Sequence, residues 1–188
     1  MMQYYLDICI LSDPEFKVTT LMSALYNKLH RALAQFKKNT IGLSFPEMDQ
    51  DRPTLGTIMR LHGNEVDLRQ LMAKNWLVGM RDHTSVGNIM TIPVATQYRL
   101  VSRIQVKSNV ERLRRRLIKR KGISEEHAQE AISDDKAKIS LLPYVIIKSQ
   151  STGQTFKLFL EHKTIQSNPI NGEFSAYGLS HTGTIPWF

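Results

Sequence analysis

The stretch VTTLMSALYNKLHRALAQF, residues 18–36, decides the fold of this 188-residue chain. Its apolar side chains recur at intervals of three and four residues, which is the spacing of one face of an α-helix. These apolar positions are Val18, Leu21, Met22, Leu25, Leu29, Leu33 and Phe36. We therefore predict an amphipathic helix over residues 18–36.

Strand patterns lie on both sides of this helix. Residues 4–11 are rich in β-formers, and Asp13–Pro14 ends that pattern. Asn64 can cap a second helix, which carries apolar residues at 66, 68, 71 and 72. Three further strands are expected at residues 41–45, 57–62 and 89–94. The order β-α-β-β-α-β predicts a ferredoxin-like domain over residues 1–94, a scaffold that by itself indicates no function.

The second half, residues 95–188, predicts another small domain, so the chain as a whole belongs to the α+β class. Residues 98–107 alternate as in a strand, and one face of it carries Arg99, Arg103, Gln105 and Lys107. A basic helix and a polar helix at 124–132 should follow. Further strands are expected at 143–148, 155–162 and 173–179, with a turn at Gly153 between the first two.

The net charge of +8 is unevenly distributed. Residues 1–94 carry ten Lys/Arg and nine Asp/Glu, whereas residues 95–188 carry fifteen and eight. This asymmetry predicts a polyanionic partner that the second half binds.

Several other classes are disfavoured by the sequence. No run of eighteen apolar residues is present, and the N-terminus does not have the pattern of a signal peptide. A single cysteine, Cys9, can form neither a disulfide framework nor a Cys-rich zinc site. We therefore expect a cytoplasmic protein with no membrane contact, no metal and no cofactor.

The segment SNVERLRRRLIKRK, residues 108–121, is the most informative about binding. Ser108 and Glu111 form a capping box that predicts the start of a helix. One arc of this helix carries Val110, Leu113 and Leu117, and Arg114 and Lys121 lie nearer to that arc. The opposite arc carries Arg112, Arg115, Arg116, Lys119 and Arg120.

These five clustered cations favour a polyanion partner over an ordinary solvated face. Glu111 is the only acid in the segment, whereas solvated helices usually alternate charges of both signs. Arginine predominates, which suits bidentate contacts to phosphate and guanine. The apolar arc has no Trp or Phe, which disfavours a membrane surface. Composition alone leaves the choice between DNA and RNA open.

The chain resembles a known family over nearly its whole length. The matching segments are YLDI at 5–8, DPEF at 13–16, LMSALYNKLH at 21–30, IGLSFPEMD at 41–49, YRLVSRIQVKSNVERLRRRL at 98–117, SQSTGQTFKLF at 149–159, YGLS at 177–180 and PWF at 186–188. Together and in this order they resemble the type I-F (Csy-class) CRISPR repeat-processing endoribonucleases of the Cas6 family.

The resemblance implies a metal-independent endoribonuclease. It would bind the stem-loop of the CRISPR repeat RNA, cut at the 3′ foot of the hairpin and stay bound to the mature crRNA. Its partners would be that RNA and the other subunits of the type I-F surveillance complex, and the free protein would be a monomer.

The resemblance also implies the catalytic residues. The histidine that ends the KLH segment, His30, would be the general base. Ser149, with Ser151 beside it, would hold the attacking ribose. Tyr177 of the YGLS segment would orient the histidine.

The RNA-binding residues follow from the same comparison. Arg103 and Gln105 would read base edges below the stem, beside Lys107 on the same strand face, and Phe156 would stack on a base at the foot of the stem. The Arg-rich helix would enter the major groove through Arg112, Arg115, Arg116, Lys119 and Arg120. Where the family often has Arg–Arg, this chain has Lys119–Arg120, and lysine cannot form a bidentate fork.

The residue types agree with this chemistry. The 2′-OH of RNA can attack the adjacent phosphate, and a histidine is a suitable base for that proton. The sequence shows no Asp/Glu cluster and no His-rich metal motif. Water, or His30 itself after it has taken up a proton, could protonate the leaving 5′ oxygen, and the sequence does not decide between them. We expect the other five histidines to be surface or boundary residues. These are His62, His83, His127, His162 and His181.

Two other functions remain as alternatives. A non-catalytic subunit that caps a guide RNA would share the basic helix, Arg103 and Gln105 but lack the chemistry of His30 and Ser149. A DNA-binding regulator would rest on the basic helix alone.

Overall fold

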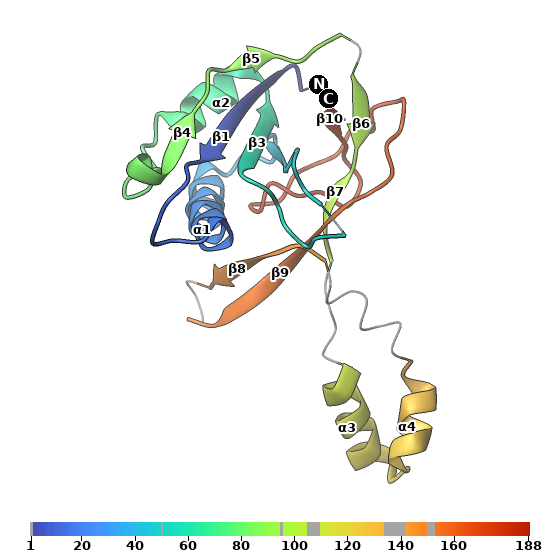
Figure 1. Ribbon diagram of the computed structural model, residues 1–188. Coiled ribbons are helices and arrows are strands. Elements are labelled where there is room, and N and C mark those ends of the chain that lie inside the picture. The colour runs from blue at the N-terminus through green and yellow to red at the C-terminus, as the bar shows by residue number, and fades with distance from the viewer. Residues whose placement is uncertain (1, 50, 95, 105–109, 134–141, 150–152) are drawn as a thin grey trace.

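The computed structural model describes residues 2–49, 51–94, 96–104, 110–133, 142–149 and 153–188 (Figure 1). This part of the chain has an α+β fold with four α-helices and antiparallel sheets. The helices are α1 (Val18–Phe36), α2 (Glu65–Met72), α3 (Val110–Lys121) and α4 (Glu125–Ala131), with one turn of 3₁₀ helix at Arg81–His83. None of these helices is long and apolar enough to cross a bilayer.

The first sheet is built from the N-terminal half. It contains β1 (Tyr4–Ile10), β2 (Gly42–Ser44), β3 (Ile58–Gly63) and β4 (Thr84–Val86) in the order β2-β3-β1-β4. Every pairing is antiparallel, and the two-residue β5 (Met90–Thr91) also pairs with β1. The helix predicted over 18–36 is confirmed as α1, and its predicted apolar positions from Leu21 to Phe36 are buried.

The second half forms two smaller sheets. β6 (Gln97–Arg99) pairs with β10 (Ile185–Trp187), and β7 (Val101–Ile104), β9 (Thr155–His162) and β8 (Tyr144–Lys148) follow in the order β7-β9-β8. Their buried side chains join the core of the first sheet in one continuous cluster. The division into domains at residues 94 and 95 stays a prediction.

Three strand predictions were wrong in detail. The strand predicted over 98–107 is divided at Leu100, because β6 pairs with β10 whereas β7 pairs with β9; residues 105–107 lie outside the described part. The strand predicted at 89–94 is confirmed only at its two-residue centre, β5, whereas β4 lies before the predicted range. The strand predicted at 173–179 is a loop, since Ser175 N–H donates to the Leu179 carbonyl and Gly178 N–H donates to the Ser175 carbonyl, closing a turn.

Local signals were confirmed where they set an element's boundary. The Asn64 side chain accepts a hydrogen bond from Asp67 N–H and so caps α2. The predicted polar helix is α4, which Ser124 caps through His127 N–H. The strands predicted at 143–148 and 155–162 are β8 and β9, and Gly153 lies between them with a positive φ of 66°.

Helices α3 and α4 stand apart from the sheets and pack against each other (Figure 1). Val110, Ala128 and Ile132 are buried in this helix pair. The Arg114 guanidinium donates to the Ile132 carbonyl from Nε at 3.1 Å and from Nη2 at 2.7 Å. Arg114 therefore faces α4, on the apolar side of α3, as predicted. Ser108 of the expected capping box is outside the described part.

Two of the histidines expected at the surface are buried, so the prediction was wrong for His62 and His162. Their exposed fractions are 0% and 6%. His62 lies on the central strand β3 and shares a 2.8 Å hydrogen bond with the Ser44 hydroxyl. Burial, and then the positive charge of Arg60, lower the pKa of His62 to about 3. Burial, and then Arg99, lower the pKa of His162 to about 3.

These two histidines predict a pH-dependent stability. The unfolded chain takes up a proton at each of them below pH 6.5, whereas the folded protein does not until about pH 3. Between pH 7.5 and 5.5 the free energy of unfolding should therefore fall by about 1.4 kcal/mol for each histidine. Urea denaturation at the two pH values measures this loss. His62→Gln should reduce it by about half, and substitution of the exposed His127 by Gln should leave it unchanged; equal pH dependence in all three proteins would contradict the prediction.

Candidate active site and RNA-binding surface

His30 lies six residues before the C-terminal end of α1 and is partly exposed. Its Nδ1 is 2.9 Å from the Ala176 carbonyl oxygen. A carbonyl can only accept a hydrogen bond, so Nδ1 carries a proton and donates it. In the neutral imidazole, Nε2 is then the unprotonated nitrogen. The backbone thus selects the tautomer in which Nε2 can act as a base.

The Tyr177 ring stacks on His30. The two ring centroids are 4.1 Å apart and the ring planes differ by 5°. The Tyr177 carbonyl accepts a 2.9 Å hydrogen bond from the hydroxyl of Tyr26, a residue that is 1% exposed. Burial raises the pKa of Tyr26, so its hydroxyl remains a donor. The ring of His30 is therefore fixed on one face by stacking and at one edge by a hydrogen bond.

The turn that carries Tyr177 depends on Gly178. This residue has a φ of 69°, a left-handed conformation that suits glycine. A Cβ at this position would lie 2.9 Å from the Cβ of Leu43. The close approach allows the Gly178 carbonyl to accept from Leu43 N–H at 2.9 Å, which ties the turn to the edge of β2.

Arg103 and Phe156 lie next to this pair. The guanidinium carbon of Arg103, on β7, is 5.8 Å from the Tyr177 ring centroid and 5.7 Å from the Phe156 ring centroid. Phe156 comes from β9, which pairs with β7. Four of the predicted site residues, from four segments of the chain, therefore meet at one place: His30, Arg103, Phe156 and Tyr177.

Ser149 directly follows β8. Its N–H donates to the Gln154 carbonyl at 2.9 Å, and its own carbonyl accepts from Gly153 N–H at 3.0 Å. With these hydrogen bonds Ser149 begins the turn between β8 and β9. The neighbouring Ser151 lies outside the described residues, as do Gln105 and Lys107.

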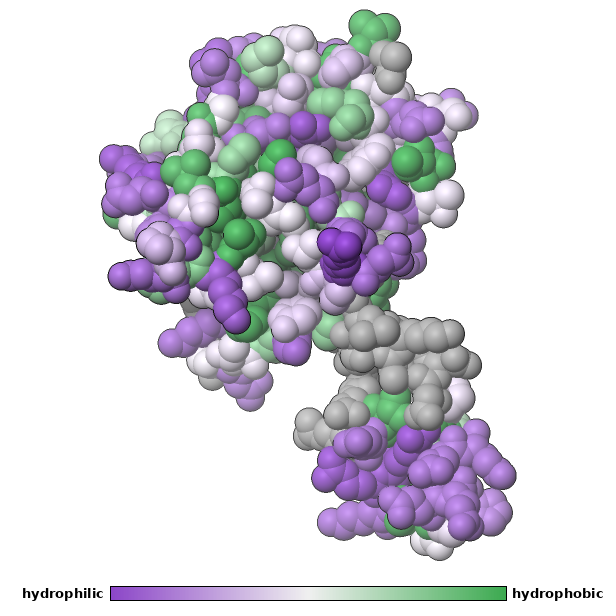
Figure 2. All heavy atoms as spheres, viewed as in Figure 1, coloured by the Kyte–Doolittle hydropathy of each residue, from purple (hydrophilic) through white to green (hydrophobic). Residues whose placement is uncertain are grey.

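The predicted basic face of α3 is exposed to solvent. Arg115, Arg116, Lys119 and Arg120 are all exposed. Arg112 belongs to the same helix, but its side chain lies outside the described part. Figure 2 shows hydrophilic residues gathered over the α3–α4 part of the molecule. Figure 1 shows α3 apart from α1, the helix that carries His30.

Comparison with known proteins places the chain in a family. The family described as "CRISPR-associated protein (Cas_Csy4)" matches residues 5–188. The chain belongs to this family. A relative from Pseudomonas aeruginosa (strain UCBPP-PA14), named CRISPR-associated endonuclease Cas6/Csy4, is 49% identical over 187 residues and covers 100% of both chains. A relative of the same name from Escherichia coli (strain UTI89 / UPEC) is 42% identical over 187 residues, again covering 100% of both chains.

Membership of the Cas_Csy4 family agrees with the resemblance inferred from the motifs. It leaves the role of each site residue in this chain as a prediction. Among the described residues, no group of three or more His, Cys, Asp or Glu side chains is placed to hold a metal ion.

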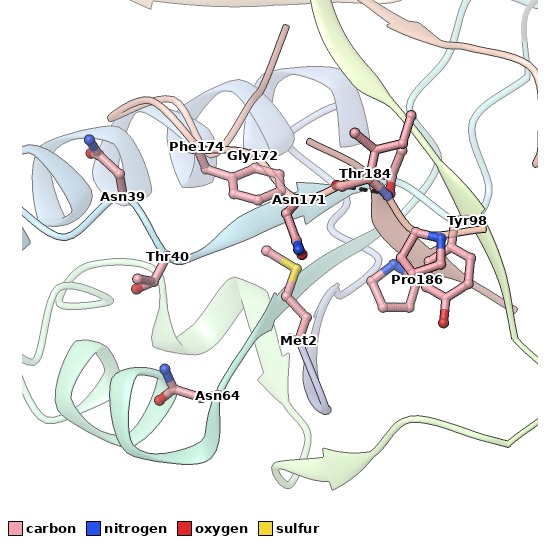
Figure 3. A pocket seen from close by; sticks show the side chains of 12 residues that line it. Met2, Asn39, Thr40, Asn64, Tyr98, Asn171, Gly172, Phe174, Thr184 and Pro186 are labelled. Carbon is pink, nitrogen blue, oxygen red and sulfur yellow. Dashed lines mark hydrogen bonds between the residues drawn. The ribbon is translucent and has the colours of Figure 1, made fainter. Parts of the chain in front are cut away.

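A pocket of about 210 Å³ lies away from the predicted site residues of this Cas_Csy4 family member (Figure 3). Its polar walls include Thr40 and Asn64, which both donate to Oδ2 of Asp67 at 2.6 and 2.8 Å. Met2, Tyr98 and Phe174 supply apolar surface. The hydrogen-bonding capacity of Thr40 and Asn64 is used within the fold, so these contacts give no indication of a ligand.

Sequence reasoning missed four residues that support the site: Ala176, Tyr26, Ser23 and Asn27. The Ala176 carbonyl is a backbone group and leaves no signal in the residue type. Tyr26 was hidden among the apolar positions of α1. Ser23 and Asn27 could have been found from the sequence, because with His30 they form a polar stripe at intervals of four and three residues along α1.

Proposed function

We propose that this protein is an endoribonuclease that binds the stem-loop of a CRISPR repeat RNA and cuts at its 3′ foot. The observation that carries the proposal is the tautomer of His30. The Ala176 carbonyl and the Tyr177 ring hold it with Nε2 as the unprotonated nitrogen, in a chain of the Cas_Csy4 family. The names of the two relatives support the same activity.

The chemistry follows from this tautomer. Nε2 of His30 removes the proton of the 2′-OH, and the oxygen attacks the adjacent phosphorus. The bond from phosphorus to the 5′ oxygen breaks, and the proton held by His30 is available for that leaving oxygen. The products are a 2′,3′-cyclic phosphate, or the 3′-phosphate formed from it, and a 5′-OH. No metal ion is needed for any of these steps.

The other predicted catalytic residues hold the reacting groups in place. Ser149 holds the attacking ribose, with Ser151 beside it, and Tyr177 orients the imidazole. The stacking distance of 4.1 Å between Tyr177 and His30 supports the last of these roles.

RNA binding involves two surfaces. The exposed cations of α3 enter the major groove of the hairpin, while Arg103 and Gln105 read bases below the stem. Lys107 adds a cation there, and Phe156 stacks on a base at the foot of the stem. The contact of the Arg103 guanidinium with the Phe156 and Tyr177 rings supports a place for the foot of the stem beside His30.

The proposal extends to the architecture and the partners. The antiparallel strand order β2-β3-β1-β4, with α1 and α2 between the strands in sequence, supports a ferredoxin-like domain over residues 1–94. Residues 95–188 form the RNA-binding domain. The protein stays bound to the mature crRNA within the type I-F surveillance complex, and it is a monomer when free.

A single-turnover cleavage assay in excess EDTA, with the CRISPR repeat RNA of the host, tests this function. We expect one cut at the 3′ foot of the hairpin. A 2′-deoxy nucleotide at the cut site should abolish cleavage without weakening binding, because it removes only the nucleophile. Cutting of the 2′-deoxy substrate would rule out the 2′-OH mechanism. Tight binding of the unmodified RNA without any cut would favour a guide-RNA capping subunit.

A further inference from the structure

Side chains of α1 form hydrogen bonds with the edge of β8 that has no neighbouring strand in the described part of the chain. The β7-β9-β8 sheet ends at β8, and β9 bonds only one of its edges. At the other edge, Ile146 N–H donates to the Ser23 hydroxyl at 3.1 Å. One turn further along α1, the Asn27 amide donates to the Ile146 carbonyl at 2.6 Å, and its Oδ1 accepts from Lys148 N–H at 3.0 Å. Asn27 thus takes the place of a neighbouring strand.

The Asn27 amide uses all its strong hydrogen-bonding groups in this arrangement. Besides its two bonds to β8, its Nδ2 donates to the Ser23 carbonyl at 2.7 Å, one turn back on the helix. That bond fixes the orientation of the amide plane. Only a side chain with both a donor and an acceptor at this length can bond the carbonyl of residue 146 and the N–H of residue 148 together.

The direction of these contacts points to the active site. From Ser23 to Asn27 the helix rises about 6 Å, and from residue 146 to residue 148 the strand advances about 6.6 Å in the same direction. His30 comes about 4.5 Å further along the helix, and Ser149 comes about 3.3 Å further along the strand. His30 therefore lies just beyond the Asn27 contact on the helix, and Ser149 lies just beyond it on the strand.

We propose that Asn27 is a positioning residue for the cleavage reaction. By holding the end of β8 against α1, it fixes the place of Ser149 relative to His30. Asn27 does not touch the reacting atoms and acts through Ser149. The inference rests on the proposed function, because it assumes that Ser149 holds the attacking ribose.

The expected effect of Asn27→Ala is a slower cut with unchanged binding. The variant loses three hydrogen bonds at a surface where water can replace them, so the fold should persist. The strand end that leads to Ser149 is then released from α1. Since a displacement of about 1 Å can cost about 10²-fold in rate, we expect the single-turnover rate at saturating protein to fall about 10- to 100-fold. The affinity for a 2′-deoxy hairpin should stay within about twofold.

A double-mutant cycle distinguishes positioning from a general structural role. The single-turnover rate is measured for the wild-type protein, Asn27→Ala, Ser149→Ala and the double variant. If Asn27 acts through Ser149, adding Asn27→Ala to Ser149→Ala should slow the reaction less than about threefold. Asn171→Ala, an exposed asparagine at the pocket of Figure 3, is the matched control and should cut at the wild-type rate.

Each of the other outcomes overturns the inference. An unchanged rate in Asn27→Ala shows that the contact does not matter for cleavage. An equal loss in the wild-type and Ser149→Ala backgrounds shows that Asn27 does not act through Ser149. A parallel loss of affinity shows that the substitution disturbs RNA binding as a whole. If the wild-type protein itself cuts no repeat RNA, the proposed function is wrong, and the inference about Asn27 is wrong for that reason.

Discussion

His30→Ala will slow single-turnover cleavage of the repeat RNA by about 10²–10⁴-fold and leave hairpin affinity within about twofold. General-base catalysis contributes a factor of this size, and no other described side chain is held beside Tyr177 in a comparable way. Binding is expected to persist because α3, which carries the cationic face, lies apart from α1, which carries His30 (Figure 1). The measurement is a time course at saturating protein, together with the affinity for a 2′-deoxy hairpin that cannot be cut.

Two controls define the role of His30. His127→Ala removes an exposed histidine of α4 and should cut at the wild-type rate. Free imidazole in the buffer should restore part of the activity of His30→Ala, because it can supply the missing base in the space left beside Tyr177. Cleavage at the wild-type rate by His30→Ala would show that another group removes the 2′-OH proton, and the site would have to be reassigned.

The sequence predicted the elements whose own residues decide their structure. Helix α1 has the same bounds in the structure as in its apolar pattern, and the caps at Asn64 and Ser124 follow from short polar side chains beside helix starts. In each case the cause lies within a few residues of the element. The periodicity of the sequence is sufficient there, and tertiary contacts only strengthen it.

The errors lie where distant partners decide the structure. The alternation at 98–107 is that of one strand, but β6 and β7 have different neighbours, and nothing local marks the change at Leu100. The pattern at 173–179 is also strand-like, yet Gly178 turns the chain there and bonds β2 instead. His62 is buried, and its side chain contacts Ser44 on β2 and the ring of Phe188, two residues whose nearness its neighbours in sequence do not reveal.

The candidate site shows the same division. The motifs pointed to His30, Tyr177, Arg103 and Phe156, which the structure brings together. The Ala176 carbonyl, which selects the tautomer of His30, is a backbone group whose position depends on the turn at Gly178. Asn27 could be noticed as a polar residue on α1, but its bonds to β8 join residues 119 and 121 positions apart in sequence.

Neutralising the basic face of α3 is the second change expected to have a large effect, and it should act on binding alone. In Arg115/Arg116/Lys119/Arg120→Ala, four exposed cations are replaced by the residue with the highest helix propensity. Arg114 is kept because its bonds to the Ile132 carbonyl hold α3 against α4. We expect the affinity for the hairpin to fall about 10³-fold at 0.1 M salt, and the slope of log affinity against log salt to fall by about three to four.

The location of the cations, and not their number, should determine this loss. A control with the same change in net charge replaces Lys17, Arg52, Arg69 and Lys74, four exposed cations of the N-terminal half, by alanine. If α3 binds the stem, this control keeps most of the affinity, and the α3 variant still cuts at nearly the wild-type rate once the protein concentration is high enough to saturate the RNA. Equal losses in the two variants would mean that the overall charge attracts the RNA without a docking surface on α3. A slow cut at saturation would mean that α3 also aligns the foot of the hairpin with His30, because the binding deficit has then been removed and only the geometry of the bound RNA can differ.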